Sequence, residues 1–113
     1  MENQIEYYDD TAKYRDRFDQ GLPQAMAAYT AFRKESYRDG ALSAKTKRLI
    51  ALAAGLQAGC TRCIIGQTKD AVKAGATKAE VLEAVAVAIV IGGTAVSAES
   101  WRVVKALEEL GKW

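Results

Sequence analysis

The chain of 113 residues contains no histidine, one proline and two cysteines. The absence of histidine removes the commonest metal ligand and the commonest general base near neutral pH. Two cysteines cannot supply a four-thiolate zinc site, and they do not form the disulfide framework of a small secreted protein. Aromatic residues make up only 8% of the chain against 50% for all hydrophobic residues. This composition is typical of helices that pack closely through small side chains.

Neither the charge nor any apolar run of the sequence indicates nucleic acid or a membrane as a partner. The 16 basic and 14 acidic residues leave a net charge of +2, so no strongly basic surface is expected. The longest uncharged apolar run covers residues 84–98, which is shorter than the roughly 20 residues of a membrane span. The N-terminus is acidic and polar where a secretory signal would be basic and then apolar, so we expect a cytoplasmic location.

The spacing of apolar residues predicts an all-α fold. We expect one compact domain over residues 1–113, with a polar N-terminal segment over residues 1–20 and five or six antiparallel helices. The expected helices cover residues 11–19, 22–33, 43–58, 60–74, 77 through the apolar run, and 98–110. No segment alternates long enough to predict a strand.

The segment that begins at Thr77 predicts a helix with an unusual surface. Thr77-Lys78-Ala79-Glu80 has the pattern of a capping box, in which each end residue satisfies a free backbone N–H of the other. The residues from Val81 to Ile91 are apolar on nearly all sides of this helix. Because a chain of this length has a modest core, we expect one side of the helix to contact another subunit.

Cys60 and Cys63 are separated by two residues at the point where a helix is expected to begin. This spacing allows the two sulfurs to form a disulfide, and the free N–H groups and dipole of the first turn favour thiolate over thiol. A thiolate is the species that attacks disulfides and peroxides. Two inert core cysteines are the alternative, but Gly59 before the pair and the helix after it favour a redox function.

Four segments around this pair follow one another in an order that resembles a known family. They are Lys45–Ala53, Gly59–Cys63, Ala74–Thr77 with Glu80 and Glu83, and Ile91–Gly93. Together they resemble the core of the alkylhydroperoxidase D-like (carboxymuconolactone decarboxylase) family over about residues 22–105. The resemblance implies an all-helical fold, trimers or hexamers, and thiol-based peroxide reduction in members that keep both cysteines. Members that decarboxylate a muconolactone generally lack the pair, so the resemblance favours redox chemistry.

Two positions depart from the pattern of this family. Gln67 stands four residues after Cys63, where redox-active members usually have a histidine, and Arg48 stands twelve residues before Cys60, where they usually have a glutamate. Glutamine can hydrogen-bond a sulfur or a water, but it cannot carry a proton near neutral pH. The usual carboxylate–histidine relay is therefore missing at both ends.

Arg48 permits two interpretations. If it points where the glutamate of the family points, it places a permanent cation near the thiols and favours the thiolate, with Arg62 adding to the effect. Otherwise it is a solvated residue on a helix surface.

From these residues we expect a thiol–disulfide oxidoreductase with (alkyl hydro)peroxidase activity. Its site would comprise Cys60, Cys63, Gln67 and Arg48. Either cysteine could attack first, although Cys63 has the spacing to Gln67 of a relay-linked thiol, with Cys60 as its disulfide partner.

The sequence contains no flavin, haem or nucleotide motif, and we expect no cofactor. A thiol protein or small thiol would supply electrons, and a small hydroperoxide or disulfide would accept them. Two alternatives remain open: a decarboxylase-like lyase acting on a small lactone or acid, and a non-catalytic oligomeric binding protein that has lost the relay.

Overall fold

Six α-helices and no strand make up the computed structural model, which describes residues 1–113. The helices are α1 (Gln4–Gly21), α2 (Pro23–Ser36), α3 (Ala44–Ala58), α4 (Thr61–Lys73), α5 (Lys78–Gly92) and α6 (Thr94–Glu109). The all-α prediction is confirmed. None of the six helices combines the length and the hydropathy that a membrane crossing requires.

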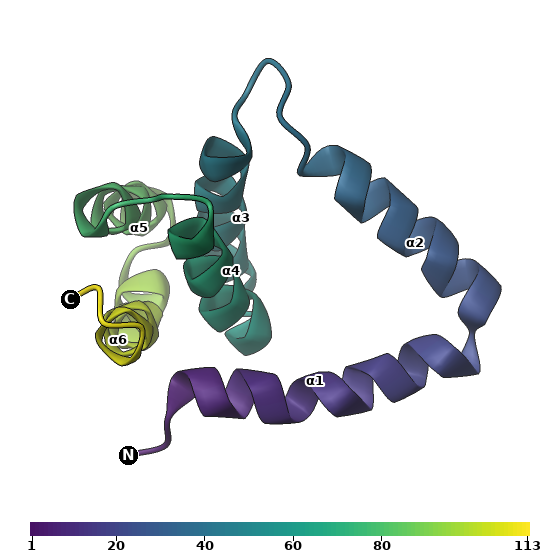
Figure 1. Ribbon diagram of the computed structural model, residues 1–113. Helices are drawn as coiled ribbons and strands as arrows, with labels where there is room; N and C mark the ends of the chain where they lie inside the picture. Colours follow the sequence, from purple (N-terminus) through teal and green to yellow (C-terminus); the bar gives the residue numbers. More distant parts are fainter.

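The core lies among the last four helices, which pack side by side (Figure 1). Its buried side chains are Leu52, Leu56, Ile64, Ala71, Ala76, Val81, Val85, Ala88, Val96, Val103 and Leu107. Within the helices these positions recur at intervals of three, four or seven residues, which is the spacing that brings one face of a helix onto its neighbours. The periodicity of apolar residues in the sequence therefore predicted the four helices that build the core.

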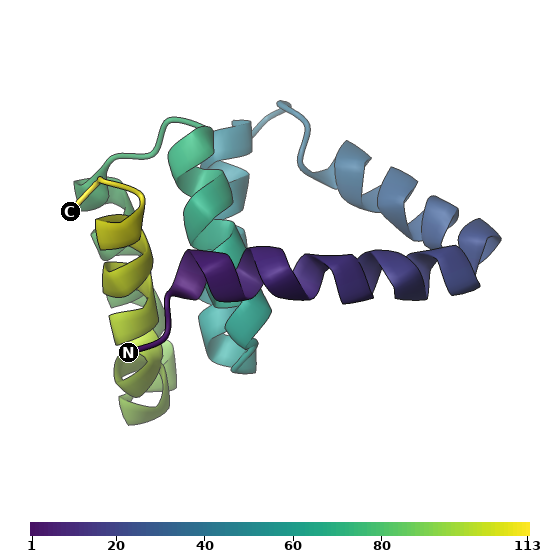
Figure 2. The ribbon, with the colours of Figure 1, turned by 60° about the horizontal axis from the view of Figure 1, so that its bottom comes forward.

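α1 and α2 form an arm that extends away from this four-helix core, as two views show (Figures 1 and 2). α2 packs chiefly against α1 and has no buried residue. Large apolar residues of this helix remain open to solvent, including Tyr29 at 49% and Phe32 at 71% exposure. The arm therefore carries an apolar surface that the single chain does not cover.

α1 begins seven residues earlier than the sequence predicts, because a residue from the opposite end of the chain caps it. The Glu109 carboxylate accepts hydrogen bonds from the backbone N–H groups of Gln4 (3.0 Å) and Ile5 (2.9 Å). The Asn3 side chain accepts another from the N–H of Glu6. Helix N-termini need such acceptors, and a carboxylate there also interacts favourably with the helix dipole. Local spacing cannot indicate a partner that lies more than 100 residues away.

α6 also begins earlier than predicted, because two glycines replace a connecting loop. Gly93 has a φ of 61° and separates α5 directly from α6. A Cβ atom at Gly92 would lie 2.7 Å from Oε1 of Gln57 on α3, so this glycine permits close packing of the helices.

α5 is buried on one side only. Val81, Val85 and Ala88 face the core, whereas Val87, Val90 and Ile91 are 66%, 80% and 80% exposed. The Thr77–Glu80 capping box is formed as predicted, and Lys45 on α3 adds an ion pair to Glu80 at 2.8 Å. The hydrogen bond from Lys45, followed by that from the Thr77 backbone, lowers the pKa of Glu80 from 4.5 to about 2.

The lowered pKa of Glu80 predicts a pH-dependent contribution to stability. The ionised carboxylate is favoured in the folded chain, so its contribution is complete above pH 4.5 and is lost as the pH falls toward about 2. Glu80→Gln retains a hydrogen-bond acceptor without the charge. We expect a lower urea midpoint than wild type at pH 7, and a difference that shrinks as the pH approaches 2. Glu83→Gln, at an exposed position, is the control. A Glu80→Gln deficit that does not change with pH would contradict the prediction.

Candidate redox site

The cysteine pair lies at a turn that the backbone specifies closely. Gly59 ends α3 with a left-handed φ of 66°, and its N–H and that of Cys60 donate to the carbonyl oxygens of Leu56 and Gly55. This pair of hydrogen bonds is the Schellman motif, in which glycine fits because it has no Cβ. Cys60 is then the N-cap of α4, and its Sγ accepts a hydrogen bond from the N–H of Cys63 at 3.2 Å. A disulfide joins Cys60 and Cys63.

α3 and α4 approach each other closely at the second cysteine. A Cβ atom at Gly55 would lie 2.9 Å from the Cβ of Cys63, closer than two carbon atoms pack without a shift. Cys63 therefore lies directly over the backbone of α3. The cysteine pair nevertheless remains accessible to solvent, because Cys63 is exposed and Cys60 is half-buried.

Both cysteines line a cleft of about 480 Å³ between α4 and the arm. The cleft is also lined by Tyr8 and Arg15 from α1, Tyr29 and Arg33 from α2, Tyr37 from the turn after α2, and Gln67 from α4. A small molecule in this cleft would therefore contact the disulfide, three tyrosines and several charged groups. No three His, Cys, Asp or Glu side chains are close enough together to hold a metal ion.

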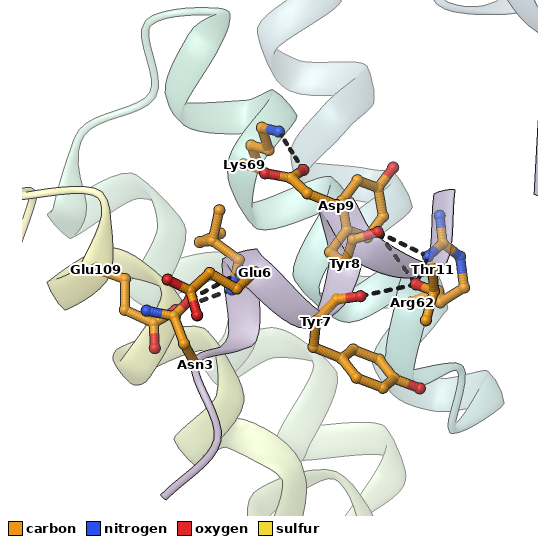
Figure 3. Close-up of polar contacts among 10 residues, drawn as sticks. Asn3, Glu6, Tyr7, Tyr8, Asp9, Thr11, Arg62, Lys69 and Glu109 are labelled. Atoms are coloured by element: carbon orange, nitrogen blue, oxygen red, sulfur yellow. Dashed lines mark hydrogen bonds and ion pairs between the residues drawn. The ribbon is translucent and has the colours of Figure 1, made fainter. Parts of the chain in front are cut away.

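Arg62 holds one wall of the cleft in place. Its guanidinium donates to the Tyr8 carbonyl oxygen (3.0 Å) and to the Thr11 hydroxyl, and it lies over the Tyr8 ring (Figure 3). A Cβ atom at Gly66 would lie 2.6 Å from the Tyr8 ring, so the glycine allows α1 to touch α4. Lys69 on α4 pairs with Asp9 on α1 at 2.9 Å. Arg62 thus binds α1, rather than standing free beside the sulfurs.

Gln67 belongs to a polar cluster behind the cysteine pair. Arg48 donates to Gln67 Oε1 (3.2 Å) and Asp70 Oδ2 (3.1 Å), and Gln67 Nε2 donates to the Tyr37 hydroxyl (3.2 Å). The Arg48 guanidinium also lies 3.6 Å from the centre of the Tyr37 ring. Gln67 is buried, at 7% exposure. Arg48 and Gln67, the two residues that depart from the family pattern, therefore link α3, α4 and the turn after α2.

The structure brings Cys60, Cys63 and Gln67 together at the cleft, whereas Arg48 lies behind Gln67 and does not line it. The Arg48 side chain is only 21% exposed and its charge is paired with Asp70, so it is not a freely solvated residue. Its effect on the thiols stays a prediction. Asp70 and Tyr37 also belong to this cluster, and neither was predicted as a site residue. The spacing of Asp70 three residues after Gln67 offered a signal, but nothing local marks Tyr37.

The sequences of known proteins show which family contains this chain. Residues 23–106 match the model of the carboxymuconolactone decarboxylase family. An uncharacterized protein of Cupriavidus necator is 38% identical over 74 residues, which span 66% of either chain. Uncharacterized protein 4 in the cox locus of Paracoccus denitrificans is 36% identical over 83 residues, which span 74% of this chain and 75% of that protein.

Solved structures of the same family have a similar fold. The apo form of a carboxymuconolactone decarboxylase family protein from Legionella pneumophila has a TM-score of 0.91 and 28% identity, and covers 98% of this chain and 100% of its own. A family member from Thermotoga maritima, for which an involvement in the antioxidative response has been suggested, has a TM-score of 0.73 and 34% identity. That comparison covers 78% of this chain and 91% of the Thermotoga protein.

The fold and the site define an all-helical protein with a disulfide-forming cysteine pair at the N-terminus of a helix. The match over residues 23–106, which is most of the chain, shows that it belongs to the carboxymuconolactone decarboxylase family. The resemblance inferred from the sequence is confirmed.

Proposed function

We propose that this protein is a thiol–disulfide oxidoreductase that reduces small hydroperoxides through Cys60 and Cys63. One observation carries the proposal: both sulfurs reach the same cleft at the N-terminus of α4, where Cys60 Sγ accepts a backbone N–H. Unpaired N–H groups and the helix dipole stabilise negative charge at this position, so they favour the reactive thiolate once the disulfide is reduced. The antioxidative role suggested for the Thermotoga relative agrees with this chemistry.

Cys63 is the better candidate to attack the peroxide, because it is the more exposed of the two and Gln67 follows it by one helical turn. Its thiolate attacks one peroxide oxygen, the O–O bond breaks, and an alkoxide leaves as the sulfur becomes a sulfenic acid. The Cys60 thiol then attacks that sulfur, water leaves, and the disulfide forms. Two electrons from an external thiol protein or small thiol restore both thiols. Such a thiol supply suits the cytoplasm, which we propose as the location.

The family name describes a decarboxylation, yet the centre of this cleft is a pair of cysteines able to form a disulfide. A lyase reaction would leave that pair without a role, and so would a purely binding function. We therefore place the redox reaction ahead of the lyase and binding alternatives. Gln67 and Arg48 then serve as positioning residues behind the sulfurs, through the contacts described above.

Peroxide treatment of the reduced protein tests this function. After one equivalent of tert-butyl hydroperoxide, we expect intact mass to fall by two hydrogens and both thiols to disappear, with reversal by a dithiol. Cys60→Ser should stop at a sulfenic acid on Cys63 that dimedone traps, whereas Cys63→Ser should not consume peroxide. Two unreactive thiols in the wild-type protein would contradict the proposal. Turnover that survives in the Cys60→Ser, Cys63→Ser double variant would favour the lyase alternative.

We also propose that the protein assembles into a homo-oligomer, a trimer or hexamer as the resemblance implies. The exposed side of α5 and the arm both present apolar residues to solvent, among them Val90 at 80% and Phe32 at 71% exposure. Exposed apolar surface of this extent commonly marks a contact between proteins. Subunit contacts on these faces would bury it.

Charge placed on the outer side of α5 tests the assembly. Because a buried, unpaired carboxylate is costly, Val90→Glu should shift the protein toward monomer in sedimentation equilibrium while keeping its helical circular dichroism. Lys112→Glu, at an exposed position near the C-terminus, should sediment as wild type. A wild-type protein that sediments as a monomer at micromolar concentration would contradict the proposal.

A further inference from the structure

Three tyrosines line the cleft beside the cysteine pair, but only one has an oriented hydroxyl. Tyr8 and Tyr29 make no side-chain hydrogen bond, whereas the Tyr37 hydroxyl is bonded to Gln67 at 3.2 Å. Tyr37 is half-buried at the C-terminal end of α2. It is therefore the one phenol in this cleft whose hydroxyl is oriented by a hydrogen bond to another side chain.

Arg48 determines which group donates in the hydrogen bond between Gln67 and Tyr37. A guanidinium can only donate hydrogen bonds, so Gln67 must turn its Oε1 toward Arg48 and its Nε2 toward Tyr37. The Tyr37 oxygen consequently accepts a hydrogen bond from Gln67. The phenolic proton cannot point back along the same line, and no other protein group accepts it. This proton remains available to a molecule in the cleft.

Two guanidinium groups lie close to the Tyr37 ring. The Arg48 guanidinium lies 3.6 Å from the centre of the ring, and that of Arg33 lies 5.5 Å from it. Asp70 offsets part of the Arg48 charge through its ion pair at 3.1 Å. These cation–π contacts and the Gln67 hydrogen bond together hold the Tyr37 side chain in place.

Hydroperoxide reduction needs an acid, because the alkoxide that leaves is strongly basic. Glutamine cannot supply an acid proton, and the chain contains no histidine that could. We propose, on the basis of the redox function given above, that Tyr37 is the catalytic acid of this site. As the Cys63 thiolate attacks and the O–O bond breaks, the Tyr37 hydroxyl gives its proton to the alkoxide. The products are an alcohol, a sulfenic acid on Cys63 and the Tyr37 phenolate, which regains its proton from water.

With this assignment, Gln67 and Arg48, the two residues that depart from the family pattern, act together on Tyr37. Gln67 orients the phenol, and Arg48 both fixes the direction of the Gln67 amide and packs against the Tyr37 ring. Both are positioning residues, since neither transfers the proton itself. A hydrophobic residue at either position would leave the Tyr37 hydroxyl without its partner or its cation.

Two oxidants with different needs for an acid test the proposal, when the variant is compared with wild type for each. tert-Butyl hydroperoxide releases a strongly basic alkoxide, whereas peroxyacetic acid releases acetate, which leaves without a proton. We would measure single-turnover oxidation of the fully reduced protein with each. Tyr37→Phe should slow the reaction with tert-butyl hydroperoxide about 100-fold, as expected for the loss of a general acid. Its reaction with peroxyacetic acid should keep the wild-type rate. Tyr14→Phe, on the exposed surface of α1 and outside the cleft lining, is the matched control.

The outcomes separate this inference from the proposed function. Equal rates of wild type and Tyr37→Phe with tert-butyl hydroperoxide would overturn the role of Tyr37 and leave the redox function standing. Equal slowing with both oxidants would also overturn it, because Tyr37 would then act on the thiolate or the fold. A wild-type protein that reacts with neither oxidant would overturn the redox function and this inference together. Gln67→Leu removes the group that orients the phenol. It should slow the reaction with tert-butyl hydroperoxide less than Tyr37→Phe does, and it should leave the rate with peroxyacetic acid unchanged.

Discussion

α3 and α4 touch at Gly55, and the arrangement around the cysteine pair depends on that contact. The space left by the missing side chain admits Cys63, and the left-handed Gly59 turns the chain so that Cys60 caps the next helix. The same packing sets Arg48 on α3 opposite Gln67 and Asp70 on α4. A larger residue at Gly55 would therefore disturb both the disulfide and the polar cluster.

The cleft requires a second set of contacts that hold the arm in place. Glu109 binds the first turn of α1, and Arg62 binds α1 again where it crosses α4. Beyond these anchors α1 and α2 leave the core (Figure 2). Residues of both helices form the opposite wall of the cleft. α2 buries none of its own residues, so the shape of this wall depends on α1 and on whatever covers the arm.

Features set by local spacing could be predicted from the sequence, and those set by distant contacts could not. Neighbouring residues predict the start of the helix over 43–58, the Thr77–Glu80 box and the cysteine pair at a helix N-terminus. The structure has all three, and the Ser43 side chain caps α3. Gln67 faces the cleft because four residues make about one helical turn. By contrast, the Glu109 cap joins the two ends of the chain, and the Arg48–Gln67–Tyr37 cluster joins three segments. Such contacts depend on tertiary packing, which periodicity does not specify.

The central claim is that this turn makes the reduced cysteine pair reactive without a histidine. A pH titration of the thiolate ultraviolet absorbance in the reduced protein tests it most directly, with each single Cys→Ser variant to assign the signal. The account predicts a thiolate that persists well below about pH 8.5, the midpoint of an ordinary cysteine. Two thiols that titrate at or above that midpoint would show that the α4 N-terminus does not activate the pair, and would contradict the account.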